Sequence, residues 1–261
     1  MTSGYVFDNE GAHSADQHRH LAELLDPLTF ERLGQTGVAD GWSCLEVGAG
    51  GGSVALWLAD RVAPTGRVLA TDIKPALIPT RSGLTVVRHD IVDDPLPSDE
   101  FDLIHARLVL SHLPRRQRVL ERLRAALRPG GWLQIDEIDI SRWAPLLTPD
   151  ERARELYETY IETMARVLAA AGSDPTWGGS AAQAMSEAGL VDIDPQCHTE
   201  VWGPGSAGIG LLTSNSLHLE ERFVAAGMTR SQLRDVRAVM ADPGFRTVSF
   251  TVHSVLARRA R

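Results

Sequence analysis

The chain has 261 residues, 43% of them hydrophobic and 23% charged, so it can bury one large core and form a single α/β domain. A formal net charge of −8 argues against a nucleic-acid partner, which would require a basic patch. The sequence contains no run of eighteen apolar residues, and residues 1–9 have neither a basic region nor an apolar run. We therefore expect a cytoplasmic protein without a membrane partner, and we leave homodimerisation open.

The amino-terminal segment is predicted to be helical. Residues 15–33 carry an apolar stripe formed by Leu21, Leu24, Leu25 and Leu28. We expect residues 1–41 to form a helical cap on a main domain that spans residues 42–261.

A glycine-rich loop follows an apolar strand at residues 44–47. After Glu46, glycines stand at alternate positions, namely Gly48, Gly50 and Gly52. Glycine lets a backbone turn sharply out of a strand and approach a ligand closely, and the amides that open the next helix then face that ligand. The spacing predicts a cofactor-binding loop, with a tight strand-to-helix turn that binds nothing as the alternative.

Two nucleotide-binding patterns compete for this loop. The dinucleotide fingerprint G-x-G-x-x-G requires Gly or Ala where this chain has Ser53, and it has no acid at the position of Glu46. The pattern present is E-x-G-x-G-x-G. A nicotinamide-dependent oxidoreductase is therefore disfavoured.

An acid follows each of the next two apolar runs. Asp72 closes residues 67–72, 20 residues after Gly52, where a carboxylate can accept hydrogen bonds from both hydroxyls of a ribose. A helix N-cap at the same position would need only one acceptor and is compatible with that role. Asp90 follows the run at residues 84–88 and stands at the corresponding end of a third strand.

The glycine motif resembles motif I of the class I S-adenosylmethionine-dependent methyltransferases. Residues 101–107 resemble motif IV of that class, and residues 128–136 match its turn and fifth strand, so that an ordered series covers residues 44–137. A closer likeness is to the ubiquinone-methyltransferase-like branch and to small methyltransferases of actinobacterial secondary metabolism. It is carried by residues 7–10, 41–46 and 105–114.

The resemblance implies a fold, a cofactor and its contacts. The fold would be α/β, a Rossmann-like, doubly wound sheet of seven mostly parallel strands with an antiparallel last strand and helical lid insertions. Strands six and seven would lie at residues 191–193 and 247–252. S-adenosylmethionine would bind at the carboxyl ends of the strands and leave as S-adenosylhomocysteine. The expected contacts are Glu46, Gly48, Gly50, Gly52, Asp72, Ile73, Asp90, Ile91, Ala106 and Arg107.

Two insertions are predicted to form lids that determine what is methylated. Residues 140–172 contain a capping box at residues 148–151 followed by apolar residues at helical spacing, and residues 203–241 begin with a glycine-rich turn. Aromatic side chains suit an apolar pocket around a bulky substrate, so we expect the acceptor to contact Tyr5, Tyr160 and Trp202. Plain core packing is the alternative for the helical stripe that includes Tyr160.

Neither a metal site nor a functional cysteine is expected. Cys44 and Cys197 lie in predicted strands, where inert core thiols are commoner than a disulfide or a nucleophile. His18 and His20 would point about 200° apart on a helix and would make a poor metal pair.

The candidate catalytic groups are His112, His105 and Asp136. A sulfonium is already an activated leaving group, so the protein has to align the acceptor and help remove its proton, a task suited to histidine. His112 follows the fourth strand and is the first candidate, and His105 is the second. A hydrogen-bonded structural role is the alternative for either histidine. Asp136 could act as a base, orient an amine or cap the next segment.

We therefore expect methyl transfer to O, N or C of a small-molecule, secondary-metabolite acceptor. Two alternatives would keep the same pocket: a cyclase or isomerase that does not methylate, and a binding protein that uses the cofactor as a structural element. The pocket motifs fit all three. Formation of S-adenosylhomocysteine distinguishes methyl transfer from the two alternatives.

Overall fold

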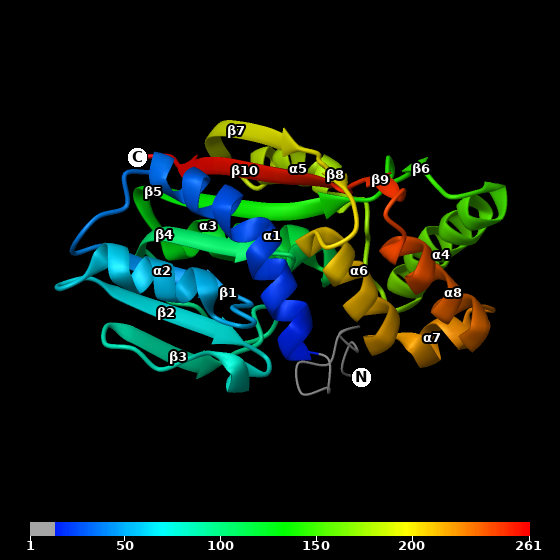
Figure 1. Ribbon diagram of the computed structural model, residues 1–261. Helices are drawn as coiled ribbons and strands as arrows, with labels where there is room; N and C mark the ends of the chain where they lie inside the picture. Colours follow the sequence, from blue (N-terminus) through cyan, green and yellow to red (C-terminus); the bar gives the residue numbers. More distant parts are fainter. Residues whose placement is uncertain (1–13) are drawn as a thin grey trace.

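The computed structural model describes residues 14–261, and its central feature is a seven-stranded sheet (Figure 1). Six of its strands run in the same direction, and β10 runs antiparallel to both of its neighbours, β5 and β7. In spatial order the strands are β3 (Leu84–Arg88), β2 (Arg67–Asp72), β1 (Ser43–Val47), β4 (Phe101–Arg107), β5 (Leu127–Asp139), β10 (Thr251–Arg259) and β7 (Leu190–His198). This arrangement confirms the predicted Rossmann-like fold.

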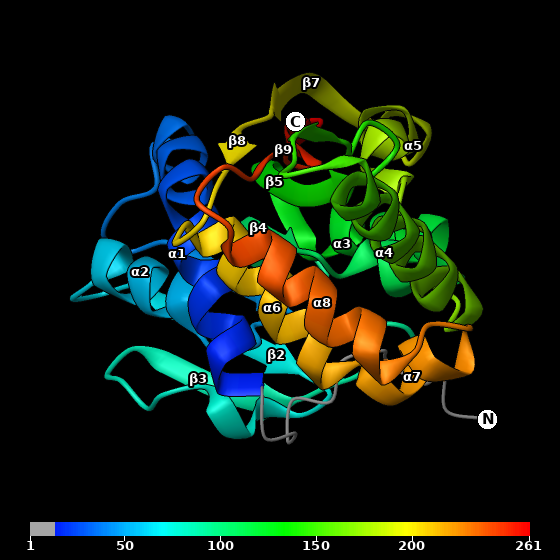
Figure 2. The ribbon, with the colours of Figure 1, turned by 45° about the vertical axis from the view of Figure 1, so that its right-hand side comes forward.

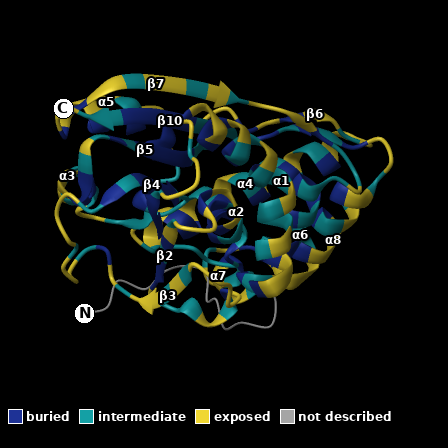
Figure 3. Ribbon diagram, turned by 90° about the vertical axis from the view of Figure 1, so that its left-hand side faces the viewer, coloured by how far each residue is buried: buried dark blue, intermediate teal, exposed yellow. Residues whose placement is uncertain are grey.

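Helices cover both faces of the sheet. In Figure 1, α1 (Ser14–Gln35) and α2 (Ser53–Val62) lie in front of it, and α3 (Arg116–Ala126) and α5 (Ala181–Glu187) lie behind. All five residues of β1 are buried, as expected for a central parallel strand that packs on both faces. The edge strands β3 and β7 are the most exposed (Figure 3).

A second hydrophobic core lies beyond the carboxyl ends of the parallel strands. It is built from α4 (Glu151–Ala170), α6 (Ala207–His218), α7 (Glu220–Ala225) and α8 (Arg230–Ala241), together with leucines of α1. Figure 2 shows α1, α6 and α8 side by side. The predicted insertions therefore fold together as one helical layer.

Short elements complete the chain. A three-stranded sheet contains β6 (Pro145–Leu147), β9 (Arg246–Val248) and β8 (Val201–Trp202). The 3-10 helices are η1 (Pro75–Leu77), η2 (Leu110–His112) and η3 (Trp177–Ser180). None of the helices within residues 14–261 is long and apolar enough to cross a bilayer.

The position predicted for strand seven was wrong. The run at residues 247–252 is divided between two sheets, because Thr247 and Val248 pair with β8 while Thr251 begins β10. Between them, Phe250 turns into the second core and packs edge-on against Trp202, with ring centroids 4.9 Å apart. The strand that joins the large sheet continues to Arg259.

Two local predictions also need correction. The N-cap of α4 is Asp150, whose side chain accepts a hydrogen bond from the backbone N–H of Ala153. The capping box predicted at residues 148–151, with Thr148 as the N-cap, is therefore not the cap of this helix. Cys44 is buried, as expected of an inert thiol, but Cys197 lies on the exposed edge strand β7.

Candidate functional site

A cavity of about 1580 Å³ opens where the carboxyl ends of β1 to β4 face the helical layer. Pockets for single small molecules usually measure about 300–1000 Å³, so this one can hold two molecules together. Its position obeys the rule that ligands of open α/β sheets bind beyond the carboxyl ends of the strands.

The glycine loop between β1 and α2 forms one wall of this cavity. Gly48, Gly50 and Gly52 have φ values of 65°, 52° and 82°, which other residues rarely adopt. A Cβ atom on Gly48 would lie 2.4 Å from Cγ2 of Val109, and one on Gly50 would lie 2.9 Å from Cε1 of His18. The backbone conformation therefore favours glycine at all three positions, and a side chain at Gly48 or Gly50 would also have to displace Val109 or His18.

The predicted acids lie at the ends of neighbouring strands. The Oδ2 atom of Asp72 accepts a hydrogen bond from the Gly50 amide at 3.0 Å, and Oδ1 accepts one from the Lys74 amide at 2.8 Å. Asp72 thus braces both the glycine loop and the turn after β2. Asp90 accepts a hydrogen bond from the amide of Val92 and is exposed at the cavity rim.

Most of the predicted cofactor contacts come together in this cavity. Gly52 and Ala106 do not line it. Those that do are Glu46, Gly48, Gly50, Asp72, Ile73, Asp90, Ile91 and Arg107.

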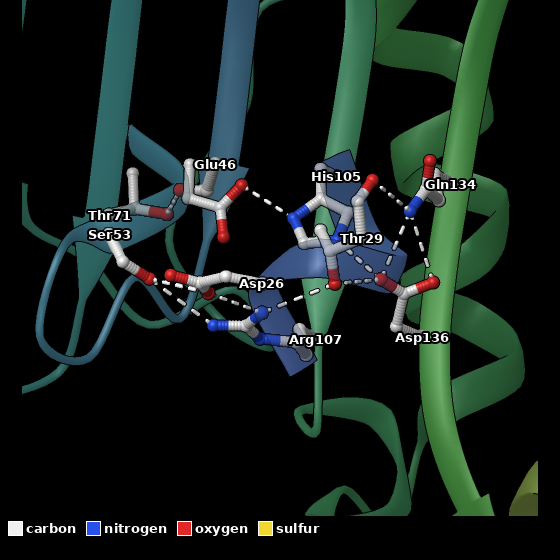
Figure 4. A network of polar contacts seen from close by, with 9 residues as sticks. All are labelled: Asp26, Thr29, Glu46, Ser53, Thr71, His105, Arg107, Gln134 and Asp136. Carbon is white, nitrogen blue, oxygen red and sulfur yellow. Dashed lines mark hydrogen bonds and ion pairs between the residues drawn. The ribbon is translucent and has the colours of Figure 1, made fainter. Parts of the chain in front are cut away.

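Arg107 connects the amino-terminal helix to the sheet. Its guanidinium donates hydrogen bonds to Asp26 at 2.9 Å and to Thr29 at 3.2 Å, both on α1, and to Ser53 at 3.3 Å, the first residue of α2 (Figure 4). Arg107 is therefore paired with a carboxylate of α1, that of Asp26.

A buried polar network lies just inside the cavity wall. His105 is completely buried, with Nδ1 2.7 Å from Oε2 of Glu46 and Nε2 3.2 Å from Oδ2 of Asp136 (Figure 4). Burial alone would lower the pKa of His105, but the two carboxylates together raise it to about 9. Burial would raise the pKa of Asp136, yet hydrogen bonds from His105 and its neighbours lower it to about 2. Neither residue lines the cavity.

Glu137 braces the turn after β4. Its Oε1 accepts hydrogen bonds from the backbone N–H groups of Val109, Leu110 and Ser111 at 3.0, 2.7 and 3.3 Å. Burial raises the pKa of this carboxyl to about 7 against the effect of those donors. The turn also contains Leu108 at φ 55°, a strained conformation of the kind found at functional sites.

His112 is the predicted catalytic residue that lines the cavity. Its Nδ1 lies 2.7 Å from Oγ of Ser173. Burial and the nearby charge of Arg116 lower the pKa of His112 to about 4, so that the imidazole is neutral at pH 7. If Nδ1 carries the proton shared with Ser173, Nε2 is the unprotonated nitrogen.

Of the aromatic residues expected around the acceptor, Tyr160 and Trp202 do not line the cavity. Tyr160 is buried in the helical core and donates a hydrogen bond to the backbone oxygen of Leu212 at 2.8 Å. Trp202 packs against Phe250 outside the large cavity. Tyr5 lies outside the described residues. The apolar wall is formed instead by Ile138, Ile140, Trp143, Met164, Leu168, Leu211, Leu212 and Phe250.

Helix α1 also contributes residues that sequence reasoning missed. His18 packs against Gly50 and Gly51, and Gln17 donates a hydrogen bond to Asn215 of α6 at 2.8 Å. Both line the cavity, where α1 packs beside α6. Within residues 14–261, no three His, Cys, Asp or Glu side chains are placed to hold a metal ion.

Comparison with known proteins agrees with this geometry. Residues 45–133 match the family model described as a methyltransferase domain. The chain is 32% identical to Methyltransferase str2 of Strobilurus tenacellus over 219 residues, which is 80% of this chain and 75% of the relative. It is 28% identical to the ubiquinone/menaquinone biosynthesis C-methyltransferase UbiE of Cupriavidus taiwanensis, over 48% of this chain and 53% of UbiE.

Among solved structures, phosphoethanolamine N-methyltransferase 2 of Haemonchus contortus, crystallised with S-adenosylhomocysteine, has the same fold. The TM-score is 0.55 with 14% identity, over 94% of this chain and 53% of the other. That likeness supports the fold alone. The similarity to str2 along most of both sequences shows the family, and the chain belongs to the class I S-adenosylmethionine-dependent methyltransferases.

Proposed function

We propose that the cavity binds S-adenosylmethionine beside a bulky, largely apolar acceptor, and that a methyl group passes to O, N or C of that acceptor. The observation that carries the proposal is that one cavity joins the glycine loop and three strand-end acids to an apolar wall containing Trp143 and Phe250. The partial match to UbiE supports the ubiquinone-methyltransferase-like branch. A secondary-metabolite acceptor fits the size and apolar character of the wall.

The residues present fit the cofactor. The glycine loop leaves space for the methionine half, Asp72 can accept hydrogen bonds from the ribose hydroxyls, and Asp90 with Ile91 can hold the adenine. When bound, S-adenosylmethionine supplies a methyl group on a positively charged sulfur, which is a good leaving group.

The chain's own residues align the acceptor and exclude water. Alignment of this kind can lower a barrier by about 7–11 kcal/mol. Helix α1 would belong to a cap at residues 1–41, and the helices of the two insertions would form lids at residues 140–172 and 203–241. His112 is placed to accept a proton from a hydroxyl or an ammonium group of the acceptor.

Binding of S-adenosylhomocysteine should raise the free energy of unfolding of the wild-type protein. At a hundredfold excess over the dissociation constant, mass action adds about 2.7 kcal/mol. Thermal unfolding with increasing ligand measures this, with NAD as the control that should have no effect. Absence of binding at millimolar S-adenosylhomocysteine would contradict the proposal.

Replacing Asp72 by Ala should weaken the binding of S-adenosylhomocysteine at least tenfold. Each charge-assisted hydrogen bond to a ribose hydroxyl contributes about 1.5–3 kcal/mol, and the support of the Gly50 amide is lost as well. Isothermal titration measures the affinity, and circular dichroism checks the fold. Lower stability with unchanged affinity would show that Asp72 only braces the loop and the turn.

Turnover separates methyl transfer from the alternatives that keep the pocket. Wild-type protein, S-adenosylmethionine and a panel of phenols, amines and quinol-type compounds should yield S-adenosylhomocysteine together with a methylated product. Conversion of an acceptor without formation of S-adenosylhomocysteine would instead support a cyclase or isomerase.

A further inference from the structure

We propose that His105 is a positioning residue for cofactor binding: held between two carboxylates inside the sheet, it orients Glu46 so that one oxygen of that carboxylate faces the amino-acid half of S-adenosylmethionine. This inference rests on the proposed function, because it requires the amino-acid half to lie over the glycine loop. His105 itself does not touch the cofactor and acts through Glu46.

The strand register brings the three groups together. Glu46 on β1 stands directly opposite His105 on β4, and Asp136 projects from the next strand, β5. The side chains lie in a row across the face that α1 covers, and Thr29 of α1 donates a hydrogen bond to Asp136 at 2.7 Å (Figure 4). The row is therefore fixed at both ends by the backbone of the sheet.

The hydrogen bonds require a charged imidazole. A carboxylate oxygen only accepts hydrogen bonds, and a neutral imidazole has a single N–H group. Contacts of 2.7 Å to Glu46 and 3.2 Å to Asp136 on the two ring nitrogens are both satisfied when each nitrogen carries a proton. The raised pKa of His105, about 9, agrees with this geometry. Both contacts are then charge-assisted.

Only one end of this row reaches the cavity. Glu46 lines the cavity, whereas His105 and Asp136 do not. Figure 4 shows the second oxygen of Glu46 pointing away from His105, toward the end of its strand. The charged groups facing His105 are Glu46 and Asp136, and Arg107 lies farther along, paired with Asp26. Two carboxylates and one imidazolium leave one net negative charge, which complements the ammonium group of the methionine half.

Ligand binding to His105→Gln tests the inference. Glutamine keeps a polar side chain but removes the charge and one donor. The affinity for S-adenosylhomocysteine should fall at least tenfold, about 1.4 kcal/mol. The affinity for 5′-methylthioadenosine, which lacks the amino and carboxylate groups, should change by less than about twofold. Equal losses for both ligands would contradict the inference.

A double-mutant cycle shows whether His105 acts through Glu46. In a Glu46→Gln background, adding His105→Gln should cause no further loss of affinity for S-adenosylhomocysteine, since the carboxylate that it orients is gone. Thr29→Val is the matched control, because it removes the hydrogen bonds of Thr29 with Asp136 and Arg107 and leaves the contact between His105 and Glu46 in place. It should lower stability but spare affinity. Additive losses in the cycle would overturn the inference.

A spectroscopic measurement on the wild-type protein needs no stable variant. With ¹⁵N-labelled histidine, both ring nitrogens of His105 should be protonated at pH 8, where an ordinary histidine of pKa 6.5 is neutral. In Glu46→Gln the same signals should shift toward the neutral form. A neutral His105 at pH 7 in the wild type would refute the inference. Failure of the wild type to bind S-adenosylhomocysteine would instead refute the proposed function.

Discussion

Replacing His112 by Ala is expected to lower the rate of methyl transfer by about 10²–10⁴-fold, the usual contribution of a positioned general base. Of the three catalytic candidates, His112 is the one that lines the cavity. Its imidazole is neutral at physiological pH, because burial and Arg116 lower the pKa of His112 to about 4. As the proposed base, His112 would therefore be in its working form without prior loss of a proton.

The pH dependence of the rate follows from that low pKa. The neutral form of His112 predominates above about pH 4, so kcat/KM should show no rising limb near pH 6.5, the ordinary value for histidine. Single-turnover rates with any acceptor that the wild type methylates provide the measurement. A rise in kcat/KM near pH 6.5 that is absent in His112→Ala would contradict the low pKa of His112.

Two variants separate a base from a structural histidine. His112→Gln can still donate a hydrogen bond to Ser173 but cannot take up a proton, so its rate should be as low as that of His112→Ala. Ser173→Ala keeps the base and loses only its orientation, which should reduce the rate less. Recovery of the rate in His112→Gln would show that His112 is structural.

Replacing His105 by Leu is expected to lower the free energy of unfolding by about 3–5 kcal/mol. The substitution leaves Glu46 and Asp136 buried without the cation between them, and removal of one partner from a buried ion pair typically costs that much. Urea unfolding at pH 7 measures the loss. Thr29→Val removes the hydrogen bond to Asp136 and the one from Arg107 but no charge, and it should cost only about 1.5–3 kcal/mol.

The wild-type protein should also lose stability as the pH rises. The pKa of His105 is raised from 6.5 to about 9 in the folded state, so its contribution is fully present below pH 6.5 and is lost as the pH rises through 9. A shift of that size corresponds to about 3 kcal/mol. The free energy of unfolding of Thr29→Val should fall with rising pH in the same way, and that of His105→Leu should not. The same fall in His105→Leu would show that another group causes the pH dependence.

Several features of the site were predictable because they depend on short stretches of sequence. The glycines of the loop are required by backbone conformation, which a spacing such as that of Gly48, Gly50 and Gly52 reveals directly. Asp72 and Asp90 follow strands, and parallel strands end at the same edge of a sheet. The seven-stranded, mostly parallel sheet with an antiparallel last strand followed from the family resemblance, and the structure confirms it.

The apolar wall of the cavity could not be predicted in this way. Helical spacing identified Tyr160 as part of an apolar stripe, but spacing shows that a face is buried and does not show what covers it. The stripe packs into the second core. Trp143 and Phe250, which do line the cavity, lie between regular elements, where no periodicity marks them.

The glycine-rich loop and the acids beside it could be located from the sequence, because each depends on residues close together in the chain, and the fold class followed from the family resemblance. Which of the two histidines reaches the cavity depends instead on contacts between distant residues. His105 is paired with groups 59 and 31 residues away, and those contacts depend on strand register, which places it inside the sheet. His112 lies one short turn later, and the chain leaves the sheet there, so its imidazole reaches the cavity.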